Sequence, residues 1–460
     1  MFKEQLEIIK KLKPIVLARY GEPKACINTY GCQQNVSDSE HIKGMLKMMG
    51  YSFTENAEEA DFVLFNTCAV REHAEDRVYG NIGTMKALKK ARPDMIVAVC
   101  GCMAQQEKVK ERIKKSYPYV DILFGTHVQH RLPEYMLRRM NGSKRIFDTS
   151  TETKHIVEGI PVCRDKTVKG WLPIMYGCDN FCTYCIVPYV RGRERSRASS
   201  EILREAEQMV KSGVRDITLL GQNVNSYGKG LEEDINFAKL IRKINAIEGD
   251  FRIRFMTSHP KDCTEELLDA MRDCEKVAHH LHLPVQCGND RVLKVMNRKY
   301  TRDKYLSLIK AARERIPDIS ITSDIIVGFP GETYEEFCDT VSLVKQVEYN
   351  SLFTFIYSAR PGTPAAEMSD IISHNDKGKW FDELLKTQDE IGKRKIDSML
   401  GRTYRVLCEE ESENEGFILA RTSGTDVIEF AGGKELIGKF VDVKVTNTKN
   451  VLKGTLIEKQ

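Results

Sequence analysis

The sequence predicts an α/β protein with three domains, and three patterns along the chain support that prediction. Strand-like and helix-like segments alternate at short intervals in residues 22–140. A βα alternation with longer units follows in residues 164–396, and residues 397–460 contain only short strands separated by turns. Alternating strands and helices are typical of parallel sheets, whereas short strands alone are typical of sandwiches and barrels. A chain of 460 residues is also too long for a single core.

Residues 22–140 are expected to form a three-layer domain with a parallel sheet. The segments "KACINTY", "ADFVLFNTC" and "MIVAVCGC" are the predicted strands, and a helical pattern follows each of them. The first helix, "SDSEHIKGMLKMMG", is predicted to begin at Ser37 as its N-cap, with Glu40 three residues later. In open α/β sheets ligands bind outside the carboxyl ends of the strands, so thiols at these ends form a candidate metal site. The three strand ends provide Cys32, Cys68 and Cys102.

A polar segment, residues 141–163, is interpreted as a linker to the second domain, residues 164–396. Six strand patterns alternate with helical patterns there, which is too few for an eight-fold barrel but suits a partial (β/α)6 barrel. The carboxyl ends of these strands, where barrels of this type place their chemistry, are rich in polar residues. After a charged helix near residues 380–400, residues 397–460 are expected to form a small β-barrel.

The composition is that of an ordinary soluble protein. The chain has 70 basic and 66 acidic residues, and the small excess of positive charge permits an acidic partner without arguing for one. The longest apolar runs are the length of a strand, and the N-terminus lacks the continuous apolar core of a signal peptide. We therefore expect no membrane association and a cytoplasmic, reducing location, in which the 14 cysteines bind metal, catalyse or pack.

The segment "GCDNFCTYC" places Cys178, Cys182 and Cys185 within eight positions. Structural zinc requires four ligands, and no fourth Cys or His follows at a matching distance, although a remote residue such as His259 could complete the set. A ferredoxin-type run would contain a fourth local cysteine followed by proline. Three thiolates suit a [4Fe–4S] cluster in which one iron has no protein ligand.

The C-x-x-x-C-x-x-C spacing at the end of the first barrel strand resembles the radical S-adenosylmethionine (SAM) superfamily. The resemblance implies that the open iron chelates the amino and carboxylate groups of SAM. One electron then cleaves SAM to a 5′-deoxyadenosyl radical, which is chemistry of the cofactor. It also implies an adenine contact for Tyr184 and a strand end lining the SAM site at "GFPGE". The other candidate SAM contacts are Gln222, Asn223, Ser258, Gln286, Asp324, Val327 and Tyr357.

The segments "YGCQQN", "NTCAVRE" and "CGCMAQQE" resemble the N-terminal domain of the methylthiotransferases. This resemblance implies a second, auxiliary [4Fe–4S] cluster on Cys32, Cys68 and Cys102. Cys100 competes with Cys102, but the cysteine of the family is the one followed by "MAQ". From about residue 24 to the end the chain is similar to the MiaB-type tRNA methylthiotransferases, with "GQNVN" as the most discriminating piece, and the last domain is similar to the RNA-binding TRAM module.

The resemblance implies methylthiolation of carbon 2 of the isopentenylated adenosine at tRNA position 37, next to the anticodon. One SAM would donate the methyl group to sulfur on the auxiliary cluster, and a second SAM would provide the radical. The target base must be extruded from the anticodon loop to be reached. The expected partners are a tRNA anticodon stem-loop, an electron donor and a sulfur donor, both of which the sequence leaves unidentified, and the expected state is a monomer.

A run of arginines follows the second cysteine motif, and arginine contacts to phosphate position an RNA without reading its sequence. The candidate RNA contacts are Arg191, Arg193, Arg195 and Arg197, together with Arg405, Arg421, Lys444 and Lys453 in the last domain. Two alternatives stay open. One is a related methylthiotransferase that acts on threonylcarbamoyl-adenosine of tRNA or on a ribosomal-protein aspartate, against which "GQNVN" argues. The other is a non-catalytic RNA-binding protein stabilised by zinc.

Overall fold

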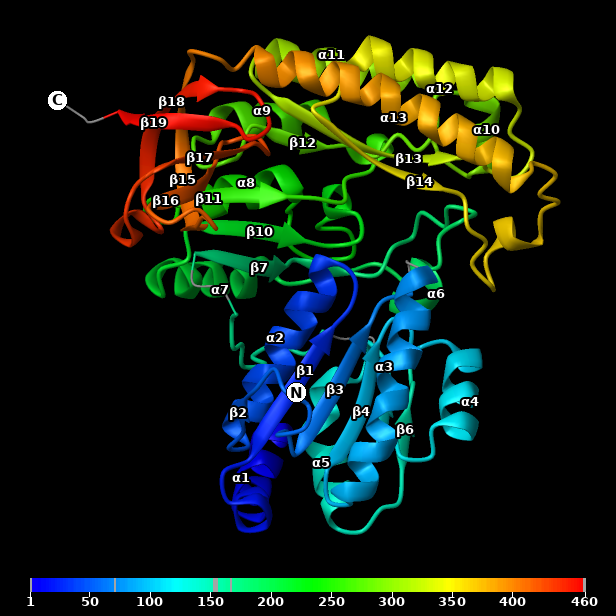
Figure 1. The fold of residues 1–460 in the computed structure, drawn as a ribbon, viewed down its shortest axis with the longest axis vertical. Coiled ribbons are helices and arrows are strands. Elements are labelled where there is room, and N and C mark those ends of the chain that lie inside the picture. The colour runs from blue at the N-terminus through cyan, green and yellow to red at the C-terminus, as the bar shows by residue number, and fades with distance from the viewer. Residues whose placement is uncertain (1, 70–71, 152–155, 166–167, 458–460) are drawn as a thin grey trace. The chain divides into compact units, whose positions relative to one another are not determined.

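A computed structural model describes residues 2–69, 72–151, 156–165 and 168–457 of the chain (Figure 1). The chain divides into two compact units, each of which is described separately. Unit 1 comprises Met1–Asp165, Tyr176–Asp179 and Cys185–Arg195, and unit 2 comprises Lys166–Met175, Asn180–Tyr184 and Ser196–Gln460. The short strands where the chain passes between the units are β8 (Met175–Tyr176) and β9 (Arg195–Ser196).

Unit 1 contains a parallel sheet of six strands in the order β2-β1-β3-β4-β5-β6. Its two central strands, β3 and β4, are buried along their whole length because helices cover both faces of the sheet. Phe62 and Leu64 of β3 pack with the helices of one face, whereas Val63 and Phe65 pack with those of the other, as strand alternation requires. The predicted three-layer fold is thus confirmed. The strands are β1 (Lys24–Thr29), β2 (Ser52–Phe53), β3 (Phe62–Thr67), β4 (Ile96–Gly101), β5 (Ile122–Phe124) and β6 (Ile146–Asp148).

The helices of unit 1 lie on the two faces of this sheet. Residues of α1, α2 and α5 share one apolar cluster with the sheet, and residues of α3 and α4 share the other. The short helix α6 follows the second cysteine motif and belongs to the same unit. The bounds are α1 (Phe2–Tyr20), α2 (Gln33–Met48), α3 (Glu72–Ala91), α4 (Glu107–Ser116), α5 (Leu132–Met140) and α6 (Val187–Arg191).

Two predictions for this region were wrong. Helix α2 has Cys32 as its N-cap and begins at Gln33, so Ser37 lies inside the helix and is buried. The early start follows from Gly31, whose φ of 129° turns the chain directly out of β1 into the helix. The segment 141–163 is not only a linker, because its β6 strand pairs in parallel with β5 at the edge of the sheet.

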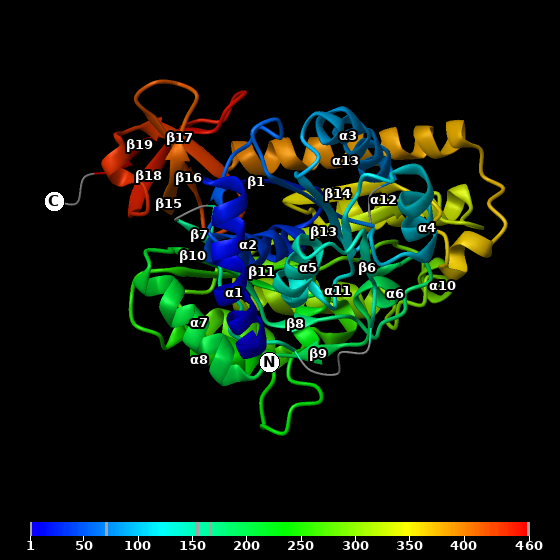
Figure 2. The ribbon, with the colours of Figure 1, turned by 90° about the horizontal axis from the view of Figure 1, so that it is seen from below.

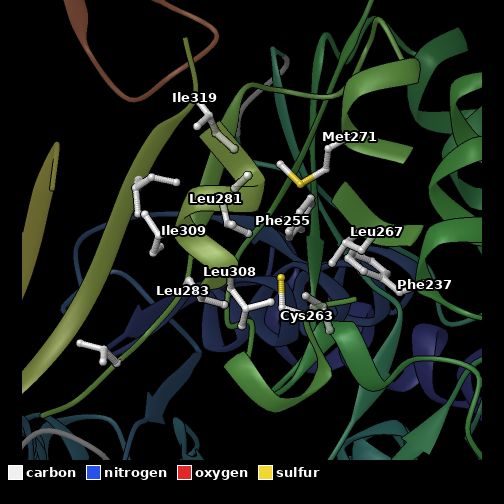
Figure 3. Packing of buried hydrophobic residues seen from close by; sticks show 14 of the residues in the cluster. Phe237, Phe255, Cys263, Leu267, Met271, Leu281, Leu283, Leu308, Ile309 and Ile319 are labelled. Atoms are coloured by element: carbon white, nitrogen blue, oxygen red, sulfur yellow. The ribbon is translucent and has the colours of Figure 1, made fainter. Parts of the chain in front are cut away.

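Unit 2 contains the predicted partial barrel. Its strands form two parallel groups, β11-β10-β7 and β12-β13-β14, and the Ala278 amide donates to the Ile253 carbonyl at 2.9 Å between them. Figure 3 shows how Phe255, Leu281 and Leu283 from the strand segments pack with Leu308 and Ile309 of α11. The strands are β7 (Lys169–Pro173), β10 (Asp216–Leu220), β11 (Arg252–Phe255), β12 (His280–His282), β13 (Ser320–Val327) and β14 (Ser351–Ile356).

Helices follow the strands in turn around the outside of this barrel, as in other βα-barrels. Their apolar faces contribute to one continuous core with the strands. In sequence order they are α7 (Ser199–Lys211), α8 (Phe237–Asn245), α9 (Glu265–Asp273), α10 (Asp290–Val295), α11 (Arg302–Arg315), α12 (Tyr334–Val347) and α13 (His374–Asp397). Among the helices that the structure describes, none combines the length and apolar character needed to span a lipid bilayer.

The end of unit 2 is a closed five-stranded barrel in the order β15-β16-β17-β19-β18, shown in orange and red in Figures 1 and 2. The predicted short strands of this domain are present, and closure leaves the sheet without a free edge. The strands are β15 (Thr403–Glu411), β16 (Phe417–Arg421), β17 (Val427–Ala431), β18 (Phe440–Asn447) and β19 (Lys453–Ile457).

Two arginines join this small barrel to the amino ends of the (β/α)6 strands. Arg252 donates to the carbonyls of Arg421 and Thr422 at 3.1 and 2.8 Å. Arg254 donates to the carbonyls of Thr422, Ser423 and Gly424 at 2.6 to 3.1 Å, and its Nε lies 2.9 Å from the buried Asp216 carboxylate. The contact therefore consists of a turn of backbone carbonyls held by two guanidinium groups.

Candidate active site

Cys32, Cys68 and Cys102 come together at the carboxyl edge of the sheet in unit 1. Each follows one of the neighbouring parallel strands β1, β3 and β4, so the sheet itself delivers the three residues to one edge. The Cys68 thiol donates a hydrogen bond to the Cys32 sulfur. Gly31 permits this approach, because a Cβ there would lie 2.3 Å from the Cβ of Cys68.

The electrostatics of this site favour the thiolate form at Cys32 but not at Cys102. The pKa of Cys32 is lowered to about 6, chiefly by the hydrogen bond from Cys68 and further by the charge of Arg191 and the Asn35 amide, against the effect of burial. Burial raises the pKa of Cys102, which Arg191 opposes. Cys100 lies fully buried in the apolar cluster of the sheet, and burial raises its pKa well above the usual value. Of the two neighbouring cysteines, Cys102 is the one whose sulfur accepts a hydrogen bond from Arg191.

Arg191 is placed differently from the sequence-based expectation. Its guanidinium is 5% exposed, its Nη2 lies 2.8 Å from the Asp38 carboxylate, and its Nε donates to the Cys102 sulfur at 3.1 Å. Burial alone would lower the pKa of Arg191, but Asp38, Cys102 and Cys32 raise it well above the usual value. A side chain with these partners is not available to an RNA phosphate. No feature of the sequence around Arg191 indicated this role.

The second cysteine motif follows β8 in the chain. Cys178 and Cys185 belong to unit 1, whereas Cys182 belongs to unit 2. In unit 2, the buried Arg298 directs its Nη1 at the Cys182 sulfur, 3.5 Å away. Arg298 also donates to the Pro284 carbonyl at 2.6 Å and to the Tyr300 hydroxyl at 2.9 Å. This arginine, which the sequence did not indicate, directs positive charge at one sulfur of the motif.

The backbone of this motif is held in an unusual conformation. Phe181 has a φ of 47°, which few residues other than glycine adopt, and the Asn297 side chain donates to its carbonyl at 2.8 Å. Thr257 and Gln286 also have positive φ, at 63° and 72°, and both follow strands of the barrel. Such strain is found most often at ligand sites, where the surrounding structure holds it in place.

The carboxyl ends of the barrel strands also contain polar atoms that no described residue satisfies. The Ser258 hydroxyl, the His259 Nε2 and both polar side-chain atoms of Asn225 are buried and have no hydrogen-bond partner among the described residues. His259 Nδ1 accepts from the Lys261 amide, so the ring is neutral and its Nε2–H is a free donor. Unsatisfied buried polar groups are costly, and a ligand rich in polar atoms, as SAM is, fits these positions.

The predicted SAM contacts occupy varied positions. Tyr184 is half-buried and packs against the core, and Gln222 is half-buried after β10. The Asn223 side chain donates to Asp262 at 2.7 Å, and its buried oxygen has no hydrogen-bond partner among the described residues. The buried hydroxyl of Tyr357 also has no such partner. Gln286 is buried and its carbonyl accepts from Ile326, whereas Asp324 is half-buried with an oxygen 3.5 Å from His282.

Val327 was expected to contact SAM, but its position does not suit that role. Its side chain is fully buried in the core cluster, and its carbonyl accepts from the Tyr357 amide at 2.9 Å. The valine contributes to packing, so it is not retained among the proposed SAM contacts.

The remaining candidate RNA contacts separate by exposure. Arg197 is buried, with Glu205 at 2.9 Å and the Pro173 carbonyl at 2.6 Å, which gives it a structural role in place of the expected RNA contact. Arg193 is 74% exposed and pairs with Asp179, and Arg195 is half-buried beside His127. In the small barrel Lys444 is exposed.

The other three candidate residues in the small barrel have acidic partners. Arg405 is exposed beside Asp250, Arg421 pairs with Glu409, and Lys453 pairs with Glu429.

Comparison with known families agrees with this arrangement. Residues 172–344 match the radical SAM superfamily, residues 24–125 match the uncharacterized protein family UPF0004, and residues 397–457 match the TRAM domain. The chain is therefore a radical SAM enzyme, for which the superfamily implies a [4Fe–4S] cluster and SAM as cofactors. Within that superfamily, it belongs to the family of tRNA-2-methylthio-N(6)-dimethylallyladenosine synthases.

The relatives that show this membership match nearly the whole chain. The synthase of Alkaliphilus oremlandii (strain OhILAs) is 50% identical over 99% of this chain and 97% of its own length. That of Thermoanaerobacter sp. (strain X514) is 51% identical over 94% and 92%, and that of Clostridium tetani (strain Massachusetts / E88) is 52% identical over 92% and 93%.

Solved structures confirm the fold. The radical SAM methyltransferase TsrM from Kitasatospora setae matches with a TM-score of 0.54 and 14% identity over 75% of each chain. The cobalamin-dependent radical enzyme OxsB matches with a TM-score of 0.53 and 12% identity over 82% of this chain and 57% of its own.

Proposed function

We propose that this chain methylthiolates carbon 2 of the isopentenylated adenosine at tRNA position 37, next to the anticodon. The observation that supports this proposal most strongly is about 50% identity, over nearly the whole chain, to synthases named for that product. The "GQNVN" segment after β10 supports the same substrate over threonylcarbamoyl-adenosine or a ribosomal-protein aspartate.

In this proposal Cys178, Cys182 and Cys185 hold the cluster that binds SAM through an open iron. A cluster of this kind supplies the electron that cleaves SAM. Arg298 would hold the Cys182 side chain in place through its guanidinium contact to the sulfur. The unsatisfied donors Ser258 and His259 are suited to the oxygen atoms of SAM.

Further contacts to SAM are proposed from the same rim. They come from the motif loop and from the ends of β10, β12, β13 and β14. These residues are Tyr184, Gln222, Asn223, Asn225, Gln286, Asp324 and Tyr357.

The cysteine trio of unit 1 is proposed to hold the auxiliary [4Fe–4S] cluster and the sulfur that is transferred. Three converging cysteines at the strand ends, with the pKa of Cys32 held near 6, are a suitable donor set for iron. A first SAM would methylate that sulfur and a second would provide the radical, so each turnover would use two SAM molecules.

The tRNA anticodon stem-loop is the proposed substrate, and the TRAM barrel is proposed to contact it. Arg193, Arg195, Arg405 and Lys444 are the proposed phosphate contacts, since all four are at least partly exposed. A separate electron donor and sulfur donor, a monomeric state and a cytoplasmic location complete the proposal.

The decisive experiment is mass spectrometry of tRNA nucleosides from cells with and without this protein. The methylthiolated nucleoside should disappear, and its isopentenylated precursor should accumulate. Anaerobically purified protein should be brown and contain about eight irons, as two cubes of four. A colourless protein that contains zinc and leaves the tRNA nucleosides unchanged would instead support the non-catalytic alternative.

A further inference from the structure

A buried ion pair lies directly beside the cysteine trio of unit 1. Arg191, the last residue of α6, donates from Nε to the Cys102 sulfur at 3.1 Å and lies 2.8 Å from the Asp38 carboxylate of α2. Both side chains are almost completely buried, at 5% and 6% exposure. Ile186 and Val190 pack with Cys102 in the same small apolar cluster.

Charge balance explains why this arginine can be buried. An isolated guanidinium in the protein interior would be very costly, whereas a carboxylate partner offsets much of that cost. Asp38 in turn accepts from the Gln34 and Gln129 side chains at 3.1 and 3.3 Å, which fixes its orientation. The pair of Arg191 and Asp38 has no net charge, and the Nε–H of Arg191 is directed at the Cys102 sulfur.

A hydrogen bond to a sulfur that ligates a cluster affects the cluster's reduction potential. Reduction adds negative charge to the cluster and its ligands, so a donor or positive charge nearby raises the potential and a negative charge lowers it. Arg191 and Asp38 therefore have opposite effects on the same site, and their balance sets the net result.

We propose that Arg191 is a positioning residue which, balanced by Asp38, sets the reduction potential of the auxiliary cluster through its hydrogen bond to Cys102. The proposal rests on the second cluster of the proposed function. It assigns no substrate contact to either residue.

The test uses the full chain with Cys178, Cys182 and Cys185 replaced by Ala, so that only the auxiliary cluster contributes to the signal. The cluster is reconstituted anaerobically, and its one-electron midpoint is measured by potentiometric titration monitored by electron paramagnetic resonance. The same titration is carried out with R191Q, R191K and D38N, and iron is counted in every sample.

A matched control exists in the same sheet. Arg139 pairs with the buried Asp121 at 2.8 Å, but Asp121 precedes β5 and thus lies at the amino ends of the strands, away from the cysteines. R139Q breaks a partly buried ion pair of the same sheet, in which Asp121 keeps Lys89 as a second partner, so it measures the effect of a lost arginine away from the cysteines on the midpoint.

R191Q should lower the midpoint potential of the auxiliary cluster. At a potential equal to the parent's midpoint, the ratio of reduced to oxidised cluster should fall at least tenfold, which corresponds to a shift of about 59 mV for one electron. D38N should shift the midpoint in the opposite direction, and R191K should lie between R191Q and the parent. R139Q should leave the midpoint in place.

Shifts of the same sign in R191Q and D38N, or a shift in R139Q as large as that in R191Q, would overturn the proposal. If R191Q fails to retain iron, the sign of the D38N shift and the midpoint of R191K decide the question. Absence of iron from the parent itself would contradict the second cluster, which is a failure of the proposed function and not of this inference.

Discussion

The parallel strands of the barrel differ sharply between their two ends. At the carboxyl ends, the side chains of Ser258, His259 and Asn225 have buried polar atoms without partners among the described residues. At the amino ends, Arg252 and Arg254 use their donors on five contacts to carbonyls of the TRAM barrel and one to Asp216.

This difference indicates that the carboxyl ends of the strands serve ligand binding, whereas their amino ends serve the stability of the fold. A buried polar group without a partner costs free energy, which a hydrogen bond from a ligand can recover. Removing a buried arginine that donates to carbonyls and pairs with a carboxylate has the opposite effect, because it leaves the carboxylate and several carbonyls without a partner. Variants at the carboxyl ends should therefore affect cofactor chemistry, and variants at the amino ends should affect folding.

The largest effect is expected from the cysteines. Replacing Cys178, Cys182 and Cys185 with Ala should abolish formation of 5′-deoxyadenosine, measured by chromatography with dithionite as reductant, because no cluster remains to bind SAM. Replacing Cys32, Cys68 and Cys102 should preserve that reaction and stop sulfur insertion.

Each cysteine variant serves as the control for the other, and each should contain about four irons. Methylthiolated tRNA from the variant that lacks Cys32, Cys68 and Cys102 would show that the sulfur site is assigned wrongly.

At the amino ends, Arg254→Ala should cost about 3–5 kcal/mol of stability, because Asp216 is left buried without its partner. Denaturant unfolding measures the loss, and limited proteolysis should release the TRAM barrel. The control is Arg272→Ala, whose pairs with Asp269 and Asp273 are exposed and should be worth about 0–1 kcal/mol. If Arg254→Ala left stability unchanged and lost SAM affinity, the amino ends of the strands would serve cofactor binding instead of stability.

At the carboxyl ends, Ser258→Ala should weaken SAM binding about tenfold, or about 1.4 kcal/mol, and leave the stability of the free protein within about 0.5 kcal/mol. Calorimetric titration with SAM and thermal unfolding measure the two quantities.

Ser323→Ala is the matched control. The Ser323 hydroxyl already accepts from the Val285 amide at 2.9 Å and donates to the Leu283 carbonyl at 3.0 Å. Its loss should reduce stability and spare SAM affinity. If both serine variants lose stability alone, the unsatisfied Ser258 hydroxyl is not part of the SAM site.

The smallest effect concerns Glu332, which follows β13 at the same end. Burial raises its pKa to about 7, although the amides of Phe329 and Gly328 oppose the shift. The folded state therefore binds a proton that the unfolded state, with a pKa near 4.3, has released. Stability from this residue is present at low pH and is lost as pH rises toward 7.

Glu332→Gln should match the parent near pH 5 and become relatively more stable as the pH rises to 8. Urea unfolding at several pH values measures the difference. A constant difference across that range would show that Glu332 does not titrate in this window.

Much of the fold was predictable because its patterns are long and consistent. The five short strands of the TRAM barrel and the six barrel strands all lie where alternation and apolar runs indicated them. The start of α2 was missed because Ser37 and Glu40 form a good capping signal, but the turn at Gly31 starts the helix earlier. Strand β6 was missed because an edge strand of three residues has little pattern of its own.

The site was only partly predictable. Cysteine spacing and motif resemblance indicated which thiols to consider, since sulfur ligands at strand ends leave a clear sequence signal. The roles of the arginines could not be predicted, because Arg191 and Arg193 stand in the same run of alternating arginines. Arg191 is buried against the equally buried Asp38, 153 residues away, whereas Arg193 pairs with the exposed Asp179.

The path of the chain also determines how this protein can be dissected. Residues 176–179 and 185–195 belong to unit 1, although they interrupt the sequence of unit 2, and Cys182 lies between them. No single cut in the polypeptide therefore yields either unit whole. A fragment that ends at residue 165 lacks Arg191, and one that begins after residue 165 retains a segment whose packing partners have been removed. Transplanting the N-terminal sheet onto another radical enzyme would require the receiving chain to supply this inserted segment as well.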